Sequence, residues 1–261
     1  SSAASDVYKR QNAFRSLQDK TQVIPFSKTD FVHTRLTHSL EVSVVGRSLG
    51  RMAGHTILQK HPHLKQSLGY QSNDFGAITA AASLAHDIGN PPFGHSGEKA
   101  IGHFFSSGEG VKYKNKLTDK EYQDLCDFEG NANGFKILTE SHPGTQGGLR
   151  LSYATLGAFV KYPKASLPVK PTPHVADKKY GYFQSQKTFF KEVADELSLI
   201  DGEKIFRHPL TYLVEAADDI CYTIIDFEDG INLGWISEEF ALEYLINLVK
   251  DQIDSKKYSQ L

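Results

Sequence analysis

The side chains best suited to chemistry in this sequence lie in one segment, HDIGNPPFGHSGE, at residues 86–98. His86 and the adjacent Asp87 are both side chains that bind hard or borderline metal ions. The Gly, Asn, Pro and Phe residues that follow predict a helix end and a turn, which would return His95 and Glu98 over the same pocket. Taken alone, such a segment is more often a helix stop with solvated polar residues. Other residues of the chain are therefore needed to distinguish a metal site from a simple helix stop.

A second candidate is an acidic residue in the predicted helix TYLVEAADDICYTIIDFEDG, residues 211–230. Asp218 shares a helix face with the apolar residues Val214, Ala217, Cys221, Ile224 and Ile225, whereas Asp219 shares the neighbouring face with Glu215, Tyr222 and Asp226. A bare carboxylate that faces a core is costly unless it is paired or binds a cation. Asp218 therefore needs a partner, which is an arginine, a backbone amide or a metal ion.

The segment RLTHSLEV, residues 35–42, places His38 just inside a predicted helix start, with Thr37 as a candidate cap. A lone helical histidine is more often a core or surface residue than a ligand. Together, however, His38, His86, Asp87 and Asp218 each lie on or at the end of an apolar helix. Two histidines and two aspartates form a mixed site that suits Mn²⁺, Mg²⁺, Fe²⁺ or Zn²⁺ and leaves positions for water and substrate oxygens. A closed structural zinc site usually contains cysteine, so it fits less well.

Helical periodicity dominates the elements that must position these residues, and we predict an all-α fold in one domain. Asp74 is a plausible cap for the apolar helix that leads to His86. Thr118 and Glu121 form a predicted capping box. A small β-hairpin is predicted near residues 147–153, and the Pro- and Lys-rich segment 162–182 is predicted to be a surface loop. The predicted helices span residues 37–53, 74–88, 96–106, 118–128, 131–140, 186–199, 209–228 and 237–253.

Composition excludes several classes of protein. The chain has 261 residues, 39% of them hydrophobic, and a formal net charge of -2, so no overall field attracts it to nucleic acid or membrane. No apolar run approaches the roughly 20 residues that span a bilayer. The N-terminal SSAASDVYKRQ lacks the apolar centre of a secretory signal. Two cysteines, Cys126 and Cys221, are too few for a disulfide framework, and we expect a reducing cytoplasm.

Longer strings around these residues resemble a known family. The pattern H…HD…D is similar to the signature of the HD-domain metal-dependent phosphohydrolases. Within them, the chain resembles the bacterial dGTPase-like deoxynucleoside triphosphate triphosphohydrolases over about residues 12–235. The strings that carry the resemblance are LQDKTQVIP (17–25), TRLTHSLEV (34–42), AHDIGNPPFGHSGE (85–98), YATLGAFVKYP (153–163) and PLTYLVEAADDICYTIIDFEDG (209–230).

The resemblance implies an HD-domain helical fold and a reaction in which water attacks the α-phosphate of a dNTP. The products are a deoxynucleoside and inorganic triphosphate, and dGTP is the favoured substrate. The cofactor is a divalent metal ion, with Mn²⁺ or Mg²⁺ expected first and Fe²⁺, Zn²⁺ or Co²⁺ as alternatives. The family's motif gives its ligands as His38, His86, Asp87 and Asp218.

The resemblance also assigns roles to residues outside the metal ligands. His95 and Glu98 match a catalytic pair, in which Glu98 orients the imidazole. Arg35 and Lys161 match phosphate-binding positions. The positions that hold the sugar are matched by Gln22, Tyr222 and Asp226, and a ring packed against C2′ would select deoxyribose.

The sequence departs from the family pattern at three places. Residues 1–11 do not fit it, and we expect a non-family or disordered segment there. The HD phosphohydrolase domain is expected over residues 12–261, truncated at its C-terminal end relative to the family. Relatives often carry a histidine where Gly130 stands, so an auxiliary catalytic role is expected to be absent or relocated.

Other functions remain open from the sequence. One is another HD phosphohydrolase, such as a 5′-nucleotidase or an alarmone hydrolase. Another is a non-catalytic nucleotide-sensing or regulatory subunit. The expected partners are the dNTP and further copies of the chain, a hexamer by family analogy, with no membrane. Single-stranded nucleic acid is a candidate effector, for which the lysine clusters at 112–116 and 178–179 are the available local charge.

Overall fold

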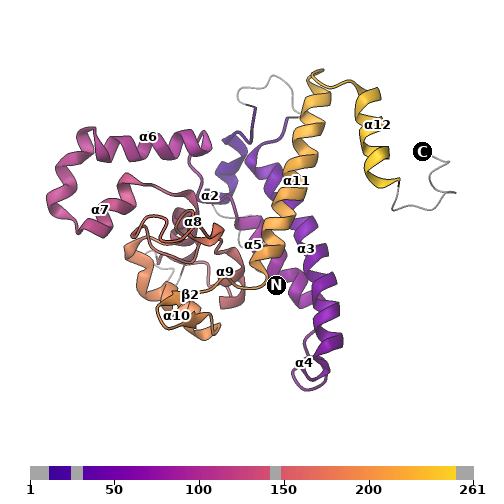
Figure 1. Ribbon diagram of the computed structural model, residues 1–261, viewed down its shortest axis with the longest axis horizontal. Helices are drawn as coiled ribbons and strands as arrows, with labels where there is room; N and C mark the ends of the chain where they lie inside the picture. Colours follow the sequence, from indigo (N-terminus) through magenta and orange to yellow (C-terminus); the bar gives the residue numbers. More distant parts are fainter. Residues whose placement is uncertain (1–11, 25–31, 142–147, 251–261) are drawn as a thin grey trace.

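The structure is a computed structural model that describes residues 12–24, 32–141 and 148–250. In this part of the chain the architecture is helical, with one two-stranded sheet (Figure 1). The prediction of an all-α fold is therefore confirmed. The α-helices are α2 (Asn12–Arg15), α3 (Arg35–Lys60), α4 (Pro62–Gln66), α5 (Ser72–Ala85), α6 (Gly94–Ser106), α7 (Asp119–Cys126), α8 (Gly130–Thr139), α9 (Tyr153–Phe159), α10 (Lys187–Glu196), α11 (Thr211–Asn232) and α12 (Glu238–Val249).

Short elements complete the described chain. The 3₁₀ helices are η1 (Ser16–Asp19), η2 (Glu109–Lys116), η3 (Val175–Asp177) and η4 (Gln184–Gln186). The strands β1 (Ile200–Asp201) and β2 (Lys204–Ile205) pair antiparallel, with Ile200 opposite Ile205. The hairpin predicted near 147–153 is wrong: residues 148–149 form a turn, residues 150–152 have no regular secondary structure, and α9 starts at Tyr153. The reason is that Ser152 caps a helix, because its hydroxyl accepts a hydrogen bond from the Thr155 amide.

Helices α3 and α5 pack along one another because glycines on α3 permit a close approach. A Cβ atom at Gly46 would lie 2.4 Å from the Ser83 Oγ atom. At Gly50 it would lie 2.7 Å from the carbonyl oxygen of Phe75. Helix α11 covers another side of α3, where Val42 contacts a buried cluster on α11 that consists of Ala217, Cys221 and Ile225. Helices α5 and α11, which are far apart in the sequence, thus both pack on α3.

The main core lies on the other side of α5. It joins the C-terminal half of α5 to α8, α9 and α10 through fully buried apolar side chains, which include Leu84, Ile88, Phe135, Leu156 and Phe190. The Phe190 ring stacks on Tyr182 with centroids 4.1 Å apart. This core fixes the end of α5, where His86 and Asp87 follow.

Capping side chains set the helix starts, in part differently from prediction. The Thr118–Glu121 capping box is confirmed. The cap of α3 is Thr34, and Thr37 completes its box from the third helical position. The cap position of α5 is Gln71, whose backbone N–H donates to the Asp74 carboxylate at 2.7 Å. Both predicted caps, Thr37 and Asp74, therefore lie one turn inside their helices.

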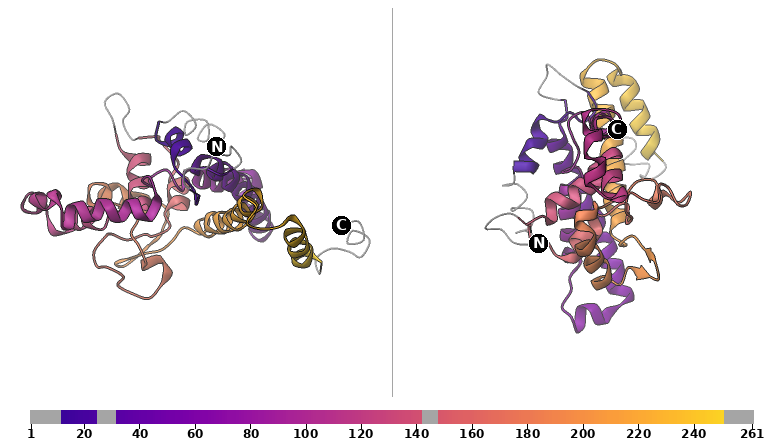
Figure 2. Two further views of the ribbon diagram at one scale, coloured as in Figure 1. Left: turned by 90° about the horizontal axis from the view of Figure 1, so that it is seen from above. Right: turned by 90° about the vertical axis from the view of Figure 1, so that its left-hand side faces the viewer.

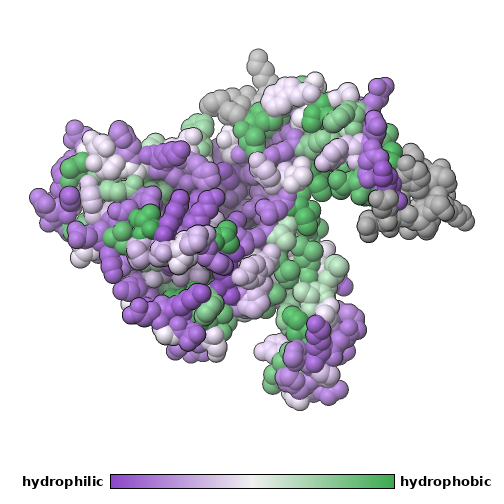
Figure 3. Space-filling model, in the orientation of Figure 1, coloured by the Kyte–Doolittle hydropathy of each residue, from purple (hydrophilic) through white to green (hydrophobic). Residues whose placement is uncertain are grey.

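Two parts project from the helical body in opposite directions. Figure 2 shows α6 and α7 extending to one side and α12 to the other. In Figure 3 the α6–α7 lobe is mainly hydrophilic, whereas hydrophobic residues gather along α11 and α12. Ile224, predicted on the core face of α11, is 52% exposed. In the described residues, no helix combines the length and the apolar character needed to cross a membrane. The predicted N-terminal segment 1–11 and residues 251–261 lie outside the described residues.

Candidate active site

A cavity of about 360 Å³ lies where α3, the end of α5, the start of α6, α9 and α11 meet. It collects most of the residues that the sequence singles out. The predicted site residues that line it are Gln22, Arg35, His38, His86, Asp87, His95, Glu98, Lys161, Asp218 and Tyr222. Asp226 lies one helical turn beyond Tyr222 and is outside the lining.

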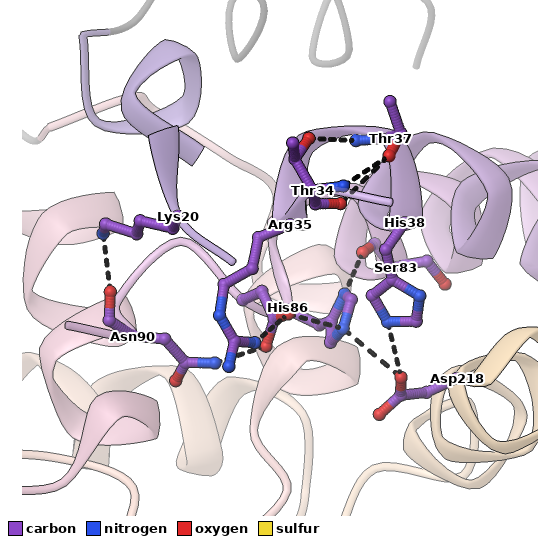
Figure 4. Close-up of polar contacts among 10 residues, drawn as sticks. Lys20, Thr34, Arg35, Thr37, His38, Ser83, His86, Asn90 and Asp218 are labelled. Carbon is purple, nitrogen blue, oxygen red and sulfur yellow. Dashed lines mark hydrogen bonds and ion pairs between the residues drawn. The ribbon is translucent and has the colours of Figure 1, made fainter. Parts of the chain in front are cut away.

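Two histidines and one aspartate converge at the base of the cavity, as Figure 4 shows. His38 Nε2 lies 3.0 Å from Asp218 Oδ1, and His86 Nε2 lies 3.4 Å from the same oxygen. The imidazole rings meet edge to face with centroids 5.2 Å apart. The His38 side chain is 1% exposed, and the Asp218 side chain is 28% exposed. Asp219, the neighbouring carboxylate, lines the cavity without a contact to either ring among the described interactions.

Both carboxylate oxygens of Asp87 are held by side chains of the protein. Arg35 Nη1 donates to Oδ2 at 2.6 Å, and Asn90 Nδ2 donates to Oδ1 at 2.5 Å. His86 Nε2 lies 3.6 Å from Oδ2. Lys20 extends this network, because its Nζ donates to the Asn90 carbonyl oxygen at 2.5 Å. The turn after α5 is thereby bound to the start of α3 and to the segment before it.

The protonation of His86 follows from its partners. Its Nδ1 lies 2.7 Å from the carbonyl oxygen of Ser83, which accepts the proton of that nitrogen. Burial opposes a charged imidazole, but the carboxylates of Asp87 and Asp218 outweigh it and raise the pKa of His86 to about 9. Burial likewise opposes charge on Asp218, but His86 and His38 hold the pKa of its carboxyl far below the ordinary range. The carboxylates of Asp87 and Asp218 therefore stabilise a positive charge that lies next to them.

The donor set fits a divalent metal ion. His38, His86 and Asp87 each offer a ligand atom, and these atoms all lie within 4.8 Å of one another. Asp218 contacts both imidazoles of this group. The Nε2 atom of His86 faces carboxylates while its Nδ1 is bound to a backbone carbonyl, the arrangement that orients histidine ligands at metal sites. Imidazole nitrogens combined with carboxylates match the preferences of several divalent metals.

His95 and Glu98 form a second pair at the mouth of the cavity, on the first turns of α6. His95 Nδ1 lies 2.7 Å from Glu98 Oε2. The other carboxylate oxygen of Glu98 accepts a hydrogen bond from the Gly130 amide at 2.8 Å. Lys179 Nζ lies 3.8 Å from Glu98 and 3.1 Å from Glu129. The carboxylate is fixed on three sides, whereas the His95 side chain is 77% exposed.

The space beside Gly130 is occupied by the side chains of Asn90 and Glu98. A Cβ atom there would lie 2.2 Å from Asn90 Oδ1 and 3.0 Å from Glu98 Oε1. A larger residue there would therefore displace the ends of the side chains that bind Asp87 and His95. The amide of Gly130 contributes to the site in place of a side chain.

Cationic side chains also line the cavity. Lys161 Nζ lies 3.4 Å from Glu215 Oε1, and Arg207 Nη1 donates to the other oxygen of Glu215 at 2.8 Å. Lys178 and Lys179 reach the same cavity from the segment after α9. A cavity with this lining offers several cations to a polyanionic ligand.

Tyr222 and Gln22 form the remaining edge. Tyr222 is 49% exposed, and the Asp226 carboxylate beside it raises the pKa of its phenol through charge and a hydrogen bond. The Oε1 atom of Gln22 is buried without a partner among the described residues. This acceptor is therefore available to a ligand hydroxyl.

Sequence reasoning missed several residues of the site. Asn90 follows Asp87 by three residues across the helix end, a spacing at which a side-chain amide can reach back. Lys20 lies within the string LQDKTQVIP but carries no spacing signal of its own. Lining residues that were not predicted are Asn90, Gly94, Asn131, Phe159, Tyr162, Lys178, Lys179, Thr211, Val214, Glu215 and Asp219.

Comparison with known proteins agrees with this geometry. The chain matches the HD domain family over residues 35–152. Within the family, its relatives are deoxyguanosinetriphosphate triphosphohydrolase-like proteins, as the sequence predicted. The protein of that name from Synechocystis sp. is 50% identical over 235 residues, which are 86% of this chain and 52% of the relative.

Two further relatives lead to the same family. A protein of the same name from Pseudomonas aeruginosa is 44% identical over 252 residues, 95% of this chain and 55% of the relative. A deoxyguanosinetriphosphate triphosphohydrolase from Yersinia pestis is 36% identical over 261 residues, 89% of this chain and 50% of the relative. The chain spans about half the length of the curated relatives it matches.

Proposed function

We propose that this protein hydrolyses deoxynucleoside triphosphates, with dGTP favoured, to the deoxynucleoside and inorganic triphosphate. One observation carries the proposal: a single cavity combines a buried His–Asp group, the His95–Glu98 pair and several cations. Its relatives carry the name of this activity. The reaction adds the hydroxyl of water to the α-phosphorus, breaks the bond to O5′ and transfers a proton to that oxygen.

His38, His86, Asp87 and Asp218 are the residues proposed to hold a divalent metal ion, with Mn²⁺ or Mg²⁺ expected first. When bound, such an ion neutralises phosphate charge and lowers the pKa of water. Arg35 prepares this site by orienting Asp87 through the 2.6 Å contact. The same guanidinium lines the cavity and is proposed to bind a phosphate oxygen as well.

His95 is proposed to move a proton during the reaction. Glu98 binds Nδ1 of the ring, and the Gly130 amide binds Glu98. These contacts orient the imidazole although the side chain is exposed. Nε2 then exchanges a proton with the attacking water or with a phosphate oxygen. Lys161 is proposed to bind the triphosphate chain, because it lines the same cavity as this pair.

Tyr222, Asp226 and Gln22 are proposed to hold the sugar. A phenol ring packed against C2′ leaves no room for a ribose hydroxyl. Asp226 and the unpartnered Oε1 of Gln22 are acceptors for the 3′-OH. The selection of deoxyribose is therefore steric at C2′ and polar at C3′.

The decisive experiment is incubation of the protein with each dNTP and with GTP, in Mn²⁺ or Mg²⁺, with the products separated by anion exchange. Triphosphate and deoxynucleoside in equal amounts are the expected products, fastest with dGTP. Release of phosphate or pyrophosphate would indicate another HD phosphohydrolase. Nucleotide binding without product would indicate a sensing or regulatory subunit.

Three wider expectations from the sequence are part of this proposal and remain predictions. They are assembly into a homo-oligomer, an effector role for single-stranded nucleic acid, and action in the cytoplasm. Sedimentation, binding of a labelled oligonucleotide and cell fractionation test them in that order.

A further inference from the structure

A second cluster of ionisable groups lies outside the residues proposed for the reaction. It joins the segment that leads into α3 to the C-terminal half of α11, which lie side by side in Figure 1. His33 Nδ1 lies 3.0 Å from Asp229 Oδ1, and the backbone N–H of His33 donates to Asp229 Oδ2 at 3.4 Å. The other ring nitrogen, Nε2, lies 3.2 Å from Glu41 Oε1. Asp229 is 3% exposed, so its charge needs these partners.

The two ring contacts determine the protonation of His33. A neutral imidazole has one N–H donor, whereas an imidazolium has two. Carboxylates only accept hydrogen bonds when ionised, and one faces each ring nitrogen of His33. Only the imidazolium donates to both. In the neutral ring, one nitrogen lone pair would face a carboxylate oxygen.

The electrostatic surroundings favour the same form. Burial opposes the charge, but the hydrogen bond to Asp229 and the charges of Glu41 and Asp229 outweigh it and raise the pKa of His33. The charged groups that act on the ring in the described structure are Glu41 from α3 and Asp229 and Asp226 from α11. All three are acidic.

The position of Asp229 on α11 gives this cluster a consequence for the site. Asp226 lies one helical turn before Asp229, and Tyr222 lies one turn before Asp226. On the side toward α3, Ile225 packs with Val42. The His33 cluster is the polar attachment at the end of the same helical stretch.

We propose that His33, as an imidazolium that bridges Glu41 and Asp229, is a positioning residue for the sugar-binding stretch of α11. It holds residues 222–229 against α3 and so sets where Tyr222 and Asp226 meet the nucleotide. The inference rests on the proposed function only for the identity of that ligand. The attachment itself is testable without turnover.

The direction of the pH effect follows from the raised pKa. The His33 contribution to stability is complete below its ordinary pKa of 6.5 and is lost as the pH rises through the higher value in the folded protein. The C-terminal half of α11 should therefore loosen at alkaline pH. KM for a dNTP should rise there more than kcat falls, since His33 touches no reacting atom.

The test compares wild type with His33→Gln, which removes the titration, and His33→Arg, which keeps the charge and several donors at all pH values. Glu41→Gln is a second variant that leaves the buried Asp229 intact. His55→Gln is the control, because His55 is exposed on the same α3 helix and contacts Gln59. Amide hydrogen exchange of residues 222–232 and Tm are measured from pH 6 to pH 10, together with kcat and KM for dGTP and GTP.

We expect exchange in residues 222–232 of wild type to accelerate at high pH, after correction for the intrinsic pH dependence. His33→Gln should show fast exchange and a KM for dGTP raised about tenfold already at low pH. His33→Arg should remain protected at high pH. The control should match wild type throughout.

Two results separate the possible failures. If wild type hydrolyses no dNTP but the exchange pattern is as expected, the proposed function fails and the attachment stands. If His33→Gln and Glu41→Gln leave the exchange of residues 222–232 and its pH dependence unchanged, the inference is overturned, whatever the enzyme does. Changed exchange with unchanged KM and an unchanged dGTP to GTP ratio would overturn the positioning role.

Discussion

The base and the mouth of the cavity are built in opposite ways. At the base, His38 is 1% exposed and both oxygens of Asp87 are bound by Arg35 and Asn90. At the mouth, the His95 side chain is 77% exposed and Tyr222 is 49% exposed. Both regions are rich in ionisable groups, and the clearest difference is in their histidines: His38 is buried against Asp218, whereas the exposed His95 contacts only Glu98 among the described interactions.

This difference predicts how each region responds to change. Removing one partner from a buried charge leaves the other without compensation, whereas at an exposed position water replaces the lost contact. The base should therefore lose its structure and its ligand together. The mouth should keep its structure and lose only what it does to the substrate.

Asp87→Ala should have the largest effect, because it removes a metal ligand and leaves the Arg35 guanidinium without its partner at the base. We expect complete loss of bound metal by elemental analysis, no detectable dGTP turnover and a lower Tm. Asp219→Ala is the matched control, since Asp219 lines the cavity without contacting either histidine. Full activity and unchanged metal content in Asp87→Ala would refute the proposed ligand set.

His95→Ala should be next, with kcat lowered roughly 10²–10⁴-fold, the usual contribution of a general acid–base group. Because His95 is exposed and bound only to Glu98 in the described contacts, Tm and metal content should stay at their wild-type values. His103→Ala, exposed on the same α6 helix, is the control. Loss of the metal in His95→Ala would show that the mouth and the base are not separable.

Asn90→Ala tests the base of the cavity without removing a proposed metal ligand. It removes one hydrogen bond to Asp87 but no proposed ligand, so metal affinity should fall about 10–100-fold, while saturating metal restores turnover. Metal titration followed by dGTP hydrolysis measures both. Asn73→Ala, at an exposed position near the start of α5, should change neither quantity. A variant that metal cannot rescue would place Asn90 in the chemistry itself.

Tyr222→Ala should give the smallest change, confined to the choice between substrates. Without the ring, the preference for dGTP over GTP should narrow by roughly tenfold, with dGTP turnover reduced only moderately. Competition between the two nucleotides measures the ratio. Ile224→Ala, exposed on the same helix, is the control. An unchanged ratio would remove Tyr222 from the sugar site.

The same contrast explains what could be predicted from the sequence. Periodicity indicated the helices α3, α5 and α11, and Asp218 was recognisable as a carboxylate on the apolar face of α11. On α3 the buried face consists of His38, Val42 and small residues, whereas the apolar Leu40 and Val44 are exposed. Helix starts were displaced by a turn at Thr37 and Asp74, because a capping box places polar residues at both the cap and the third helical position. Pattern alone does not say which of the two is outside the helix.

Contacts between distant segments could not be predicted in this way. The pairing of His33 with Asp229 spans 196 positions, and the contact of Lys20 with Asn90 spans 70. Neither residue type is unusual where it stands, and only the packing of α11 and of the N-terminal segment on α3 brings the partners together. The hairpin at residues 200–205 could not be predicted from the sequence either, because its strands are only two residues long.

Glycines at positions 46, 50 and 54 restrict how this protein can evolve. A methyl group at Gly50 would meet backbone atoms of α5, with the Gly76 Cα 2.9 Å away, so no rotamer change relieves it. Such a change pushes apart the two helices that carry His38 and His86, several turns from either ring. Substitutions on α3 should therefore be tolerated at exposed positions such as Val44 and Met52 and disfavoured at these three glycines. The separation of the helices that carry His38 and His86 thus depends on glycines that lie outside the cavity.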